Sequence, residues 1–243
     1  MPASPSSAHP NGDFCAPEPG PYGVGMTDVA ATTDPAPTPP QLAANRDRRL
    51  HLADAAIAVL RRRAFHEVDL DVVAHEAGVS GEEIRLLFPT WHDLLVATID
   101  VWNGRRMRPL FPIAQRFGAV AFLRSIVQAN IEDPSLMRVL SATVNIAATP
   151  GHPMAPYLQD QWHHFHAFVI RQLAVDVTAG REPDTMLPAR GAEQLIALYE
   201  GLQLQSMVRP TMDLLDAYER GVTRLRDGWS RAYAPAVWDL DVA

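Results

Sequence analysis

The side chains best suited to chemistry in this sequence lie around a short segment that follows Gly78. Arg85 carries a guanidinium that could contact a phosphate or bind guanine, and Glu82 could accept a hydrogen bond from cytosine N4. Arginines at the N-terminal end of the first predicted helix could reach a phosphate or the minor groove. We therefore predict a nucleic-acid-binding set made of Arg46, Arg48, Arg49, Ser80, Gly81, Glu82, Arg85, Leu86 and His92.

A histidine cluster is the second group that could do chemistry. His163 and His166 are spaced i, i+3, so they share a helix face and could hold one metal ion. Asp160 lies one turn earlier, but no further cysteine or carboxylate pattern completes a ligand set. Two other interpretations of the histidines remain. They could make polar contacts in a ligand pocket, or they could lie at the protein surface. We predict no metal site and no cofactor.

Apolar and amphipathic residues of the middle helices are candidates for a small-molecule pocket, because such pockets are mostly apolar with few polar groups. For each of them, packing in the protein core is the alternative. Phe111, Phe117, Phe165 and Phe168 belong to this wider group. The residues that we predict to bind ligand are Trp102, Met107, Phe122, Met137, Val144, Trp162, His163 and His166.

The elements that must position the first set are two short helices joined by a tight turn. Gly78 stands where a helix-ending residue needs positive φ. Asp69 is a predicted N-cap for the helix before the turn, and Ser80 is a predicted N-cap for the helix after it, with Glu83 completing a Ser-x-x-Glu capping box. After Pro89, the run at 90–93 has the form of a second capping box. This pattern predicts a helix-turn-helix at 69–88.

The segment resembles the helix-turn-helix of the tetracycline-repressor (TetR/AcrR) family of transcriptional regulators. The matching residues are Ala74, Ala77, Gly78, Val79, Ser80, Phe88, Leu94 and Leu95, and residues 133–140 and 194–203 resemble the family's later helices more loosely. The sequence departs from the family pattern at Ala64, Val68 and Trp91. The resemblance implies an all-helical homodimer, most simply a repressor that binds a palindromic double-stranded DNA operator and is released by an unknown small-molecule effector.

Local charge favours a different interpretation. Residues 46–95 contain seven arginines and nine carboxylates, which gives this segment a net charge of −2. A module that binds duplex DNA is normally basic. The alternative function is therefore a ligand- or protein-binding helical dimer that has lost sequence-specific DNA binding. The run at 61–63 could be a solvated helix end or a DNA-facing patch.

Composition narrows the class of protein. The chain has 243 residues, 47% of them hydrophobic, and a net charge of −7. Its one cysteine, Cys15, cannot form an internal disulfide. No apolar run is long enough to span a bilayer, and no signal peptide is recognisable. Glycine-rich phosphate loops, nucleophile elbows and His-Glu-x-x-His motifs are missing from the sequence. We predict a cytoplasmic protein that is not an enzyme and has no membrane contact.

The order of helical patterns and breaks predicts an all-α fold. Residues 1–44 are predicted to be a disordered tail rich in Pro, Ala and Ser, 45–92 the helix-turn-helix domain, 93–231 the effector-binding and dimerisation domain, and 232–243 a C-terminal tail. Helices are predicted at 46–63, within 69–88, and at 91–107, 117–131, 134–148, 154–178, 189–208 and 212–231.

The last two predicted helices each carry an apolar stripe. Leu195, Leu198 and Leu202 mark one stripe, and Tyr218 and Val222 belong to the other. Packing inside their own domain would explain both stripes. With the family resemblance, however, we predict that the helices at about 189–208 and 212–231 pair with their copies in a homodimer, as a four-helix bundle about a two-fold axis.

Overall fold

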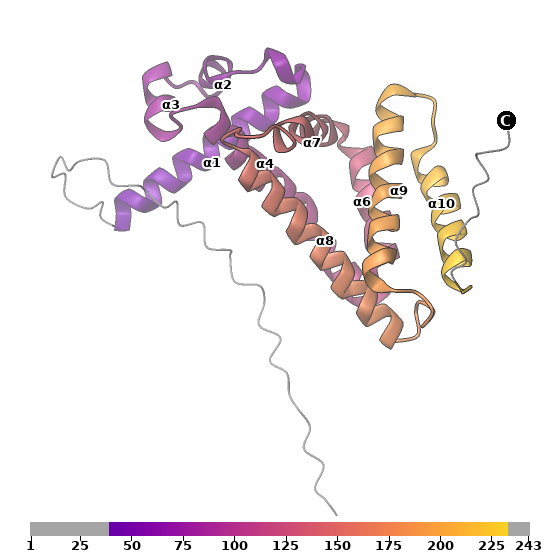
Figure 1. The fold of residues 1–243 in the computed structure, drawn as a ribbon. Helices are drawn as coiled ribbons and strands as arrows, with labels where there is room; N and C mark the ends of the chain where they lie inside the picture. Colours follow the sequence, from indigo (N-terminus) through magenta and orange to yellow (C-terminus); the bar gives the residue numbers. More distant parts are fainter. Residues whose placement is uncertain (1–38, 233–243) are drawn as a thin grey trace, which may run out of the picture. The chain divides into compact units, whose positions relative to one another are not determined.

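A computed structural model describes residues 39–232, and within that range every regular element is a helix (Figure 1). The prediction of an all-α fold is confirmed. In chain order the elements are α1 (Pro39–Arg62), the 3-10 turn η1 (Phe65–Glu67), α2 (Leu70–Ala77), α3 (Gly81–Leu87), α4 (Trp91–Met107), α5 (Phe111–Phe117), α6 (Ala119–Glu132), α7 (Pro134–Ala147), α8 (Ala155–Thr178), α9 (Pro188–Val208) and α10 (Leu214–Trp229).

The predicted caps shape the turn between α2 and α3. Asp69 accepts a hydrogen bond from the Val72 N–H (2.9 Å), and Ser80 Oγ accepts one from the Glu83 N–H (3.0 Å). Gly78 ends α2 with φ at 69°, as the turn requires. Within the described residues, Glu83 makes no return bond to Ser80, so only half of the predicted capping box forms. α3 is too short to be stable alone and is held by buried Ile84 and Phe88.

Helix α4 connects this N-terminal part, which we call the head (α1–α3), to the later helices. It spans the predicted residues, and a complete capping box closes its N-terminus. The Thr90 hydroxyl accepts from the Asp93 N–H, and the Asp93 carboxylate accepts from the Thr90 N–H. Leu94, Leu95 and Trp102 pack into the same apolar core as α1. That core also takes in side chains of α7 and α8. The head therefore shares its packing with the helices that follow residue 92.

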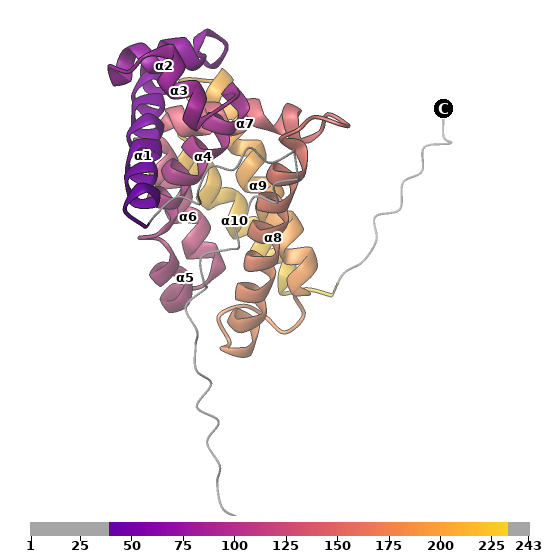
Figure 2. The same cartoon turned by 90° about the vertical axis from the view of Figure 1, so that its left-hand side faces the viewer.

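Helices α6, α8, α9 and α10 pack together (Figure 2). Their side chains form most of a second apolar core. Both predicted C-terminal stripes contribute to it. Leu195 is fully buried, and Tyr218 and Val222 are almost so. These side chains pack within their own chain, as in the alternative explanation of the stripes. The outward face of α9 consists of other residues.

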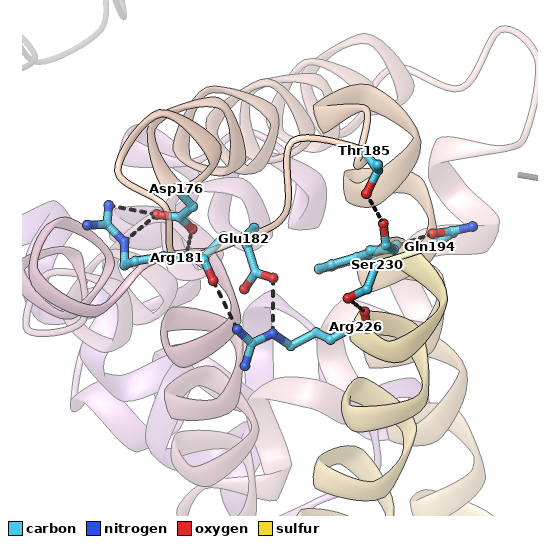
Figure 3. A network of polar contacts seen from close by, with 9 residues as sticks. Asp176, Arg181, Glu182, Thr185, Gln194, Arg226 and Ser230 are labelled. Carbon is cyan, nitrogen blue, oxygen red and sulfur yellow. Dashed lines mark hydrogen bonds and ion pairs between the residues drawn. The ribbon is translucent and has the colours of Figure 1, made fainter. Parts of the chain in front are cut away.

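Polar contacts fasten α10 to the turn that follows α8 (Figure 3). Arg226 donates through Nε to Glu182 (3.0 Å) and through Nη2 to the carbonyl oxygen of Arg181 (3.0 Å). Arg181 donates in turn to Asp176, whose side chain is almost fully buried. Trp229 Nε1 donates to Gln194 Oε1 of α9 (2.7 Å). The position of α10 is thus fixed by charged hydrogen bonds as well as by apolar packing.

The structure departs from the sequence prediction most clearly at the start of α1 and at α5. α1 begins at Pro39, so residues 39–44, predicted to be part of a tail, are helical. Prolines are tolerated in a first helical turn because its N–H groups have no helical acceptor. α5 was not predicted, because Pro109 and Pro112 suggested a break, but Pro112 stands in the first turn of that helix. Most of the predicted N-terminal tail, Cys15 and residues 233–243 lie outside the described residues.

No helix within residues 39–232 is long and apolar enough to cross a membrane.

Candidate nucleic-acid interface and ligand site

Helix α3, the second helix of the predicted helix-turn-helix, turns several predicted DNA-contacting side chains outward. Ile84 is fully buried beneath it, whereas Glu82, Arg85 and Leu86 are exposed, Leu86 by 79%. Ser80 caps the helix and Gly81 opens it. The structure therefore brings five of the predicted nucleic-acid-binding residues together on one short helix and its cap. Such a face could enter a major groove and place its side chains against base edges.

Arg85, however, is engaged within the head. Its Nη2 donates to Asp71 Oδ1 of α2 (2.8 Å), and its Nη1 donates to the Gly81 carbonyl oxygen (2.8 Å). Gly81 permits this conformation, because a Cβ there would lie 2.7 Å from Arg85 Nη1. About half of the Arg85 side chain and 68% of the Asp71 side chain are exposed. A pair this exposed is weak, so Arg85 can leave Asp71 for a stronger anion.

Arg49 has a structural role that the sequence did not indicate. Its Nη1 donates to the Leu87 carbonyl oxygen at the end of α3, and its guanidinium lies 4.0 Å from the centre of the Phe88 ring. Partial burial lowers the pKa of Arg49, and the charge of Asp93 opposes that shift. Arg49 thus caps α3 and holds it on α1, and its contact with DNA stays a prediction.

His92 is likewise engaged away from α3. Its ring meets His152, from the connection between α7 and α8, edge to face at 4.7 Å between centroids. Arg46 and Arg48, by contrast, are exposed in the N-terminal half of α1, and within the described residues neither forms an ion pair or hydrogen bond. These two arginines remain the accessible cations nearest the start of α1.

In the arginine run at 61–63, Arg61 and Arg62 pair with different carboxylates. Arg61 Nη2 donates to Asp133 at the start of α7 (2.6 Å), and Arg62 pairs with Glu76 of α2 (2.7 Å). Trp102 Nε1 of α4 also donates to Asp133 (2.8 Å), and the Arg61 guanidinium lies over the Trp102 ring. Burial acts to raise the pKa of Asp133, but the hydrogen bonds from Arg61 and Trp102 outweigh it and lower the pKa. Asp133 therefore joins α1, α4 and α7 at one carboxylate.

The predicted ligand-binding residues do not all come together. Trp102 belongs to the core shared with the head, whereas Met107 and Phe122 belong to the second core. Met137 is buried in α7, where its sulfur contacts Arg106 and the Tyr199 hydroxyl. The remaining four lie outside both cores: Val144 and His163 are exposed, and Trp162 and His166 are half-buried.

The histidine cluster lies on α8 at the surface. His164 contacts Asp160 one turn earlier (3.2 Å). Among the described residues, no group of three or more histidine, cysteine, aspartate or glutamate side chains is arranged to hold a metal ion.

A buried polar site around Arg106 was missed by the sequence analysis. Arg106 Nη2 donates to Asn103 Oδ1 (2.7 Å), and Nη1 donates to Asn130 Oδ1 of α6. Asn130 donates in turn to the Tyr199 hydroxyl (3.0 Å) and to Gln203 Oε1 (3.0 Å), both on α9. Asn130 is 1% exposed, and Tyr199 and Gln203 are 4% exposed.

The sequence held one signal for this site. Asn130 and Gln203 stand at helical spacing within apolar stripes, at positions that face the core. Arg106 gave no such signal, because it follows Arg105 at a helix C-terminus, where cations are ordinary.

Comparison with solved structures identifies the fold. FadR of Bacillus halodurans, a fatty acid degradation regulator, superposes with a TM-score of 0.61 at 14% identity, over 74% of this chain and 94% of that one. SmeT, the repressor of a Stenotrophomonas maltophilia multidrug efflux pump, gives 0.58 at 18% identity, over 74% and 89%. FadR of Thermus thermophilus, a TetR-family repressor in complex with lauroyl-CoA, gives 0.56 at 20% identity, over 79% and 100%.

The chain therefore has the fold of TetR-family transcriptional regulators, an all-α fold with an N-terminal helix-turn-helix. No family model matches the sequence, and no curated protein is similar to it in sequence.

Proposed function

We propose that the protein is a ligand-responsive transcriptional regulator, acting as a repressor in the cytoplasm. In this proposal it binds a palindromic operator as a homodimer and leaves it when a small-molecule effector binds. The observation that carries the proposal is the exposed face of α3, which is set on a capped helix-turn-helix and backed by buried Ile84 and Phe88. The fold shared with TetR-family regulators supports it.

The DNA contacts in this proposal come from few cations. Arg85 leaves Asp71 to meet a phosphate or a guanine, and Arg46 and Arg48 reach the backbone from α1. Gly81 allows the start of α3 to approach closely, and Glu82 and Leu86 face the bases. His92 contributes only if it leaves His152. Because the net charge between residues 46 and 95 is −2, affinity depends strongly on these few contacts, and their small number keeps the salt slope shallow.

Dimerisation is proposed through the outward face of α9. Ala197, Gly201, Leu204 and Val208 lie along that face at helical spacing, and Leu204 and Val208 are 59% and 76% exposed. A two-fold pairing of α9 and α10 with their copies would cover these side chains and set two heads against two half-sites. The buried stripes of α9 and α10 hold the hairpin to its own chain and leave this face for the partner.

The proposed signal passes through α4. An effector held among α4, α6, α7 and α9 shifts the C-terminal end of α4, and Asp133 and Trp102 transmit the shift to Arg61 of α1. Arg105 of α4 also pairs with Asp54 of α1, a second link to the head. The effector must bind the two arrangements unequally, and ~2 kcal/mol of such coupling changes operator affinity about thirtyfold.

The second candidate is a helical dimer without sequence-specific DNA binding, which the acidic head and the engaged Arg85 favour. Selection of genomic fragments by the purified full chain, followed by sequencing, separates the two candidates. The regulator should enrich a two-fold symmetric motif, and its Arg85→Ala variant should lose that enrichment. Recovery of no motif by the unaltered chain, at low as well as moderate salt, would reject the regulator in favour of the second candidate.

A further inference from the structure

We propose that the site around Arg106 binds an organic anion with an apolar body, and that the guanidinium of Arg106 pairs with the anionic group. This inference rests on the proposed function only in naming that anion as the effector. The binding itself is a property of the helical body and can be measured without DNA.

The first observation is an incomplete set of hydrogen bonds. Arg106 is only half-buried as a whole residue, but its Nε is enclosed and, within the described residues, has no hydrogen-bond partner. Nη1 and Nη2 meet the amide oxygens of Asn130 and Asn103, and the sulfur atoms of Met137 and Met107 lie at 3.5 and 3.8 Å. An enclosed N–H without an acceptor costs free energy, which a ligand oxygen would recover.

The second observation is an unbalanced charge. Every hydrogen-bond partner of Arg106 is neutral, and the nearby carboxylate of Asp133 is engaged by Arg61 and Trp102. Desolvation lowers the pKa of Arg106 and raises the pKa of Tyr199, so the phenol stays neutral and supplies no counter-charge. A guanidinium held among neutral groups is poorly solvated and gains most from an anion.

The third observation is a row of aromatic rings that leads away from the site. Phe165 of α8 lies 6.5 Å from Tyr199 between ring centroids, and Phe168 follows one turn later on α8. Phe168 packs on Phe122 (5.1 Å) and on Phe111 (5.4 Å), and Phe111 is 41% exposed. The row therefore runs from the buried polar site to the surface. An anionic group at Arg106 would place an apolar body along these rings.

The test uses ligands of one shape and three charges. Decanoate, 1-decanol and decylamine are titrated into the full chain by calorimetry below their aggregation limits. Hexanoate and myristate, carboxylates of other lengths, are each titrated beside the alcohol of the same length. At least one carboxylate should bind more tightly than its matched alcohol, by about ten- to a hundredfold if a charged hydrogen bond is gained. Decylamine should bind more weakly than decanol. If no carboxylate bound more tightly than its alcohol, the inference would be wrong.

Variants then locate the contact. In Arg106→Gln the preference for the carboxylate over the alcohol should disappear, while alcohol binding remains. The matched control Arg124→Gln, an exposed arginine paired with Glu219, should keep the full preference. Without ligand, Arg106→Gln should melt no lower than the unaltered chain, because it removes a poorly solvated charge. An unchanged carboxylate preference in Arg106→Gln would overturn the assignment. If that variant did not fold, the ligand series on the unaltered chain would still decide the charge preference.

This test and the test of DNA binding fail separately. Carboxylate binding through Arg106 without selective DNA binding would reject the regulator and keep the anion site. Selective DNA binding without any carboxylate preference would keep the regulator and reject the anion site.

Discussion

Substituting Asp71 by asparagine should tighten DNA binding, because Asp71 competes with DNA for Arg85. Both side chains are largely exposed, 49% for Arg85 and 68% for Asp71, so the pair is worth about 0.2–1 kcal/mol. Binding must break this pair before Arg85 can contact DNA. Asp71→Asn removes that cost and should lower Kd by about 1.4- to 5-fold. Relief of repulsion between Asp71 and phosphate adds to this gain.

Removing Arg85 should act in the opposite direction and more strongly. Arg85→Gln loses one phosphate or base contact, worth about 1–3 kcal/mol, and should reduce the salt slope of binding by about one if the contact is to phosphate. The cost to folding should be modest. Arg85→Gln loses the exposed pair and the hydrogen bond to the Gly81 carbonyl oxygen. Asp71→Asn loses the pair and a carboxylate in the first turn of α2, together about 0.5–2 kcal/mol.

The assay is fluorescence anisotropy with a selected duplex at several salt concentrations, on the two single variants and the double variant. The double variant separates release of Arg85 from simple loss of a negative charge. If Asp71→Asn tightened binding equally in the unaltered and the Arg85→Gln backgrounds, Arg85 would not be released by the change. Weaker binding by Asp71→Asn would mean that Asp71 positions Arg85 for DNA, and either result would refute the reasoning.

Three further predictions concern stability, pH and assembly. Gly118→Ala should lower the free energy of unfolding by about 2–5 kcal/mol, as measured by urea unfolding. The φ of Gly118 is +91°, and a Cβ there would lie 2.6 Å from Asp176 Oδ2, which accepts a hydrogen bond from the Ala119 N–H. The control Gly104→Ala should not destabilise the protein, because no atom lies within 4 Å of the added Cβ. Asp133→Asn should melt lower than the unaltered chain at pH 7, and the difference should vanish in acid. The lowered pKa of Asp133 contributes stability above its unfolded value, and this is lost as pH falls through the folded value. A difference that persisted in acid would point to packing instead. Leu204→Glu should shift sedimentation from dimer to monomer without lowering helicity, and an unchanged dimer would place the interface elsewhere.

Local sequence was sufficient for the elements whose ends are capped by nearby residues. The cap at Thr90 and Asp93, the positive φ at Gly78 and the cap at Ser80 all depend on groups within three or four residues, so the pattern predicts them. The start of α1 and the short α5 were missed because prolines that usually mark breaks occupy first turns here.

The candidate sites were harder to predict because their partners come from distant parts of the chain. Arg49 lies at α1, but its acceptor is the Leu87 carbonyl oxygen at the end of α3. Arg85 depends on Asp71 across the turn. Arg106 is defined by Asn130 and, beyond it, by Tyr199 on a helix far along the chain. No spacing rule links such residues, and only tertiary packing brings them together.

The most direct test of the regulator is the affinity of the purified chain for duplexes tiled across the DNA upstream of its own coding sequence, against scrambled duplexes, by anisotropy at two salt concentrations. The account predicts that one duplex binds at least about a thousandfold more tightly than scrambled DNA, with two protomers per duplex, and that higher salt weakens the binding. Equally weak binding to every duplex, together with no motif recovered from genomic fragments, would contradict it and leave the head without a DNA-reading function.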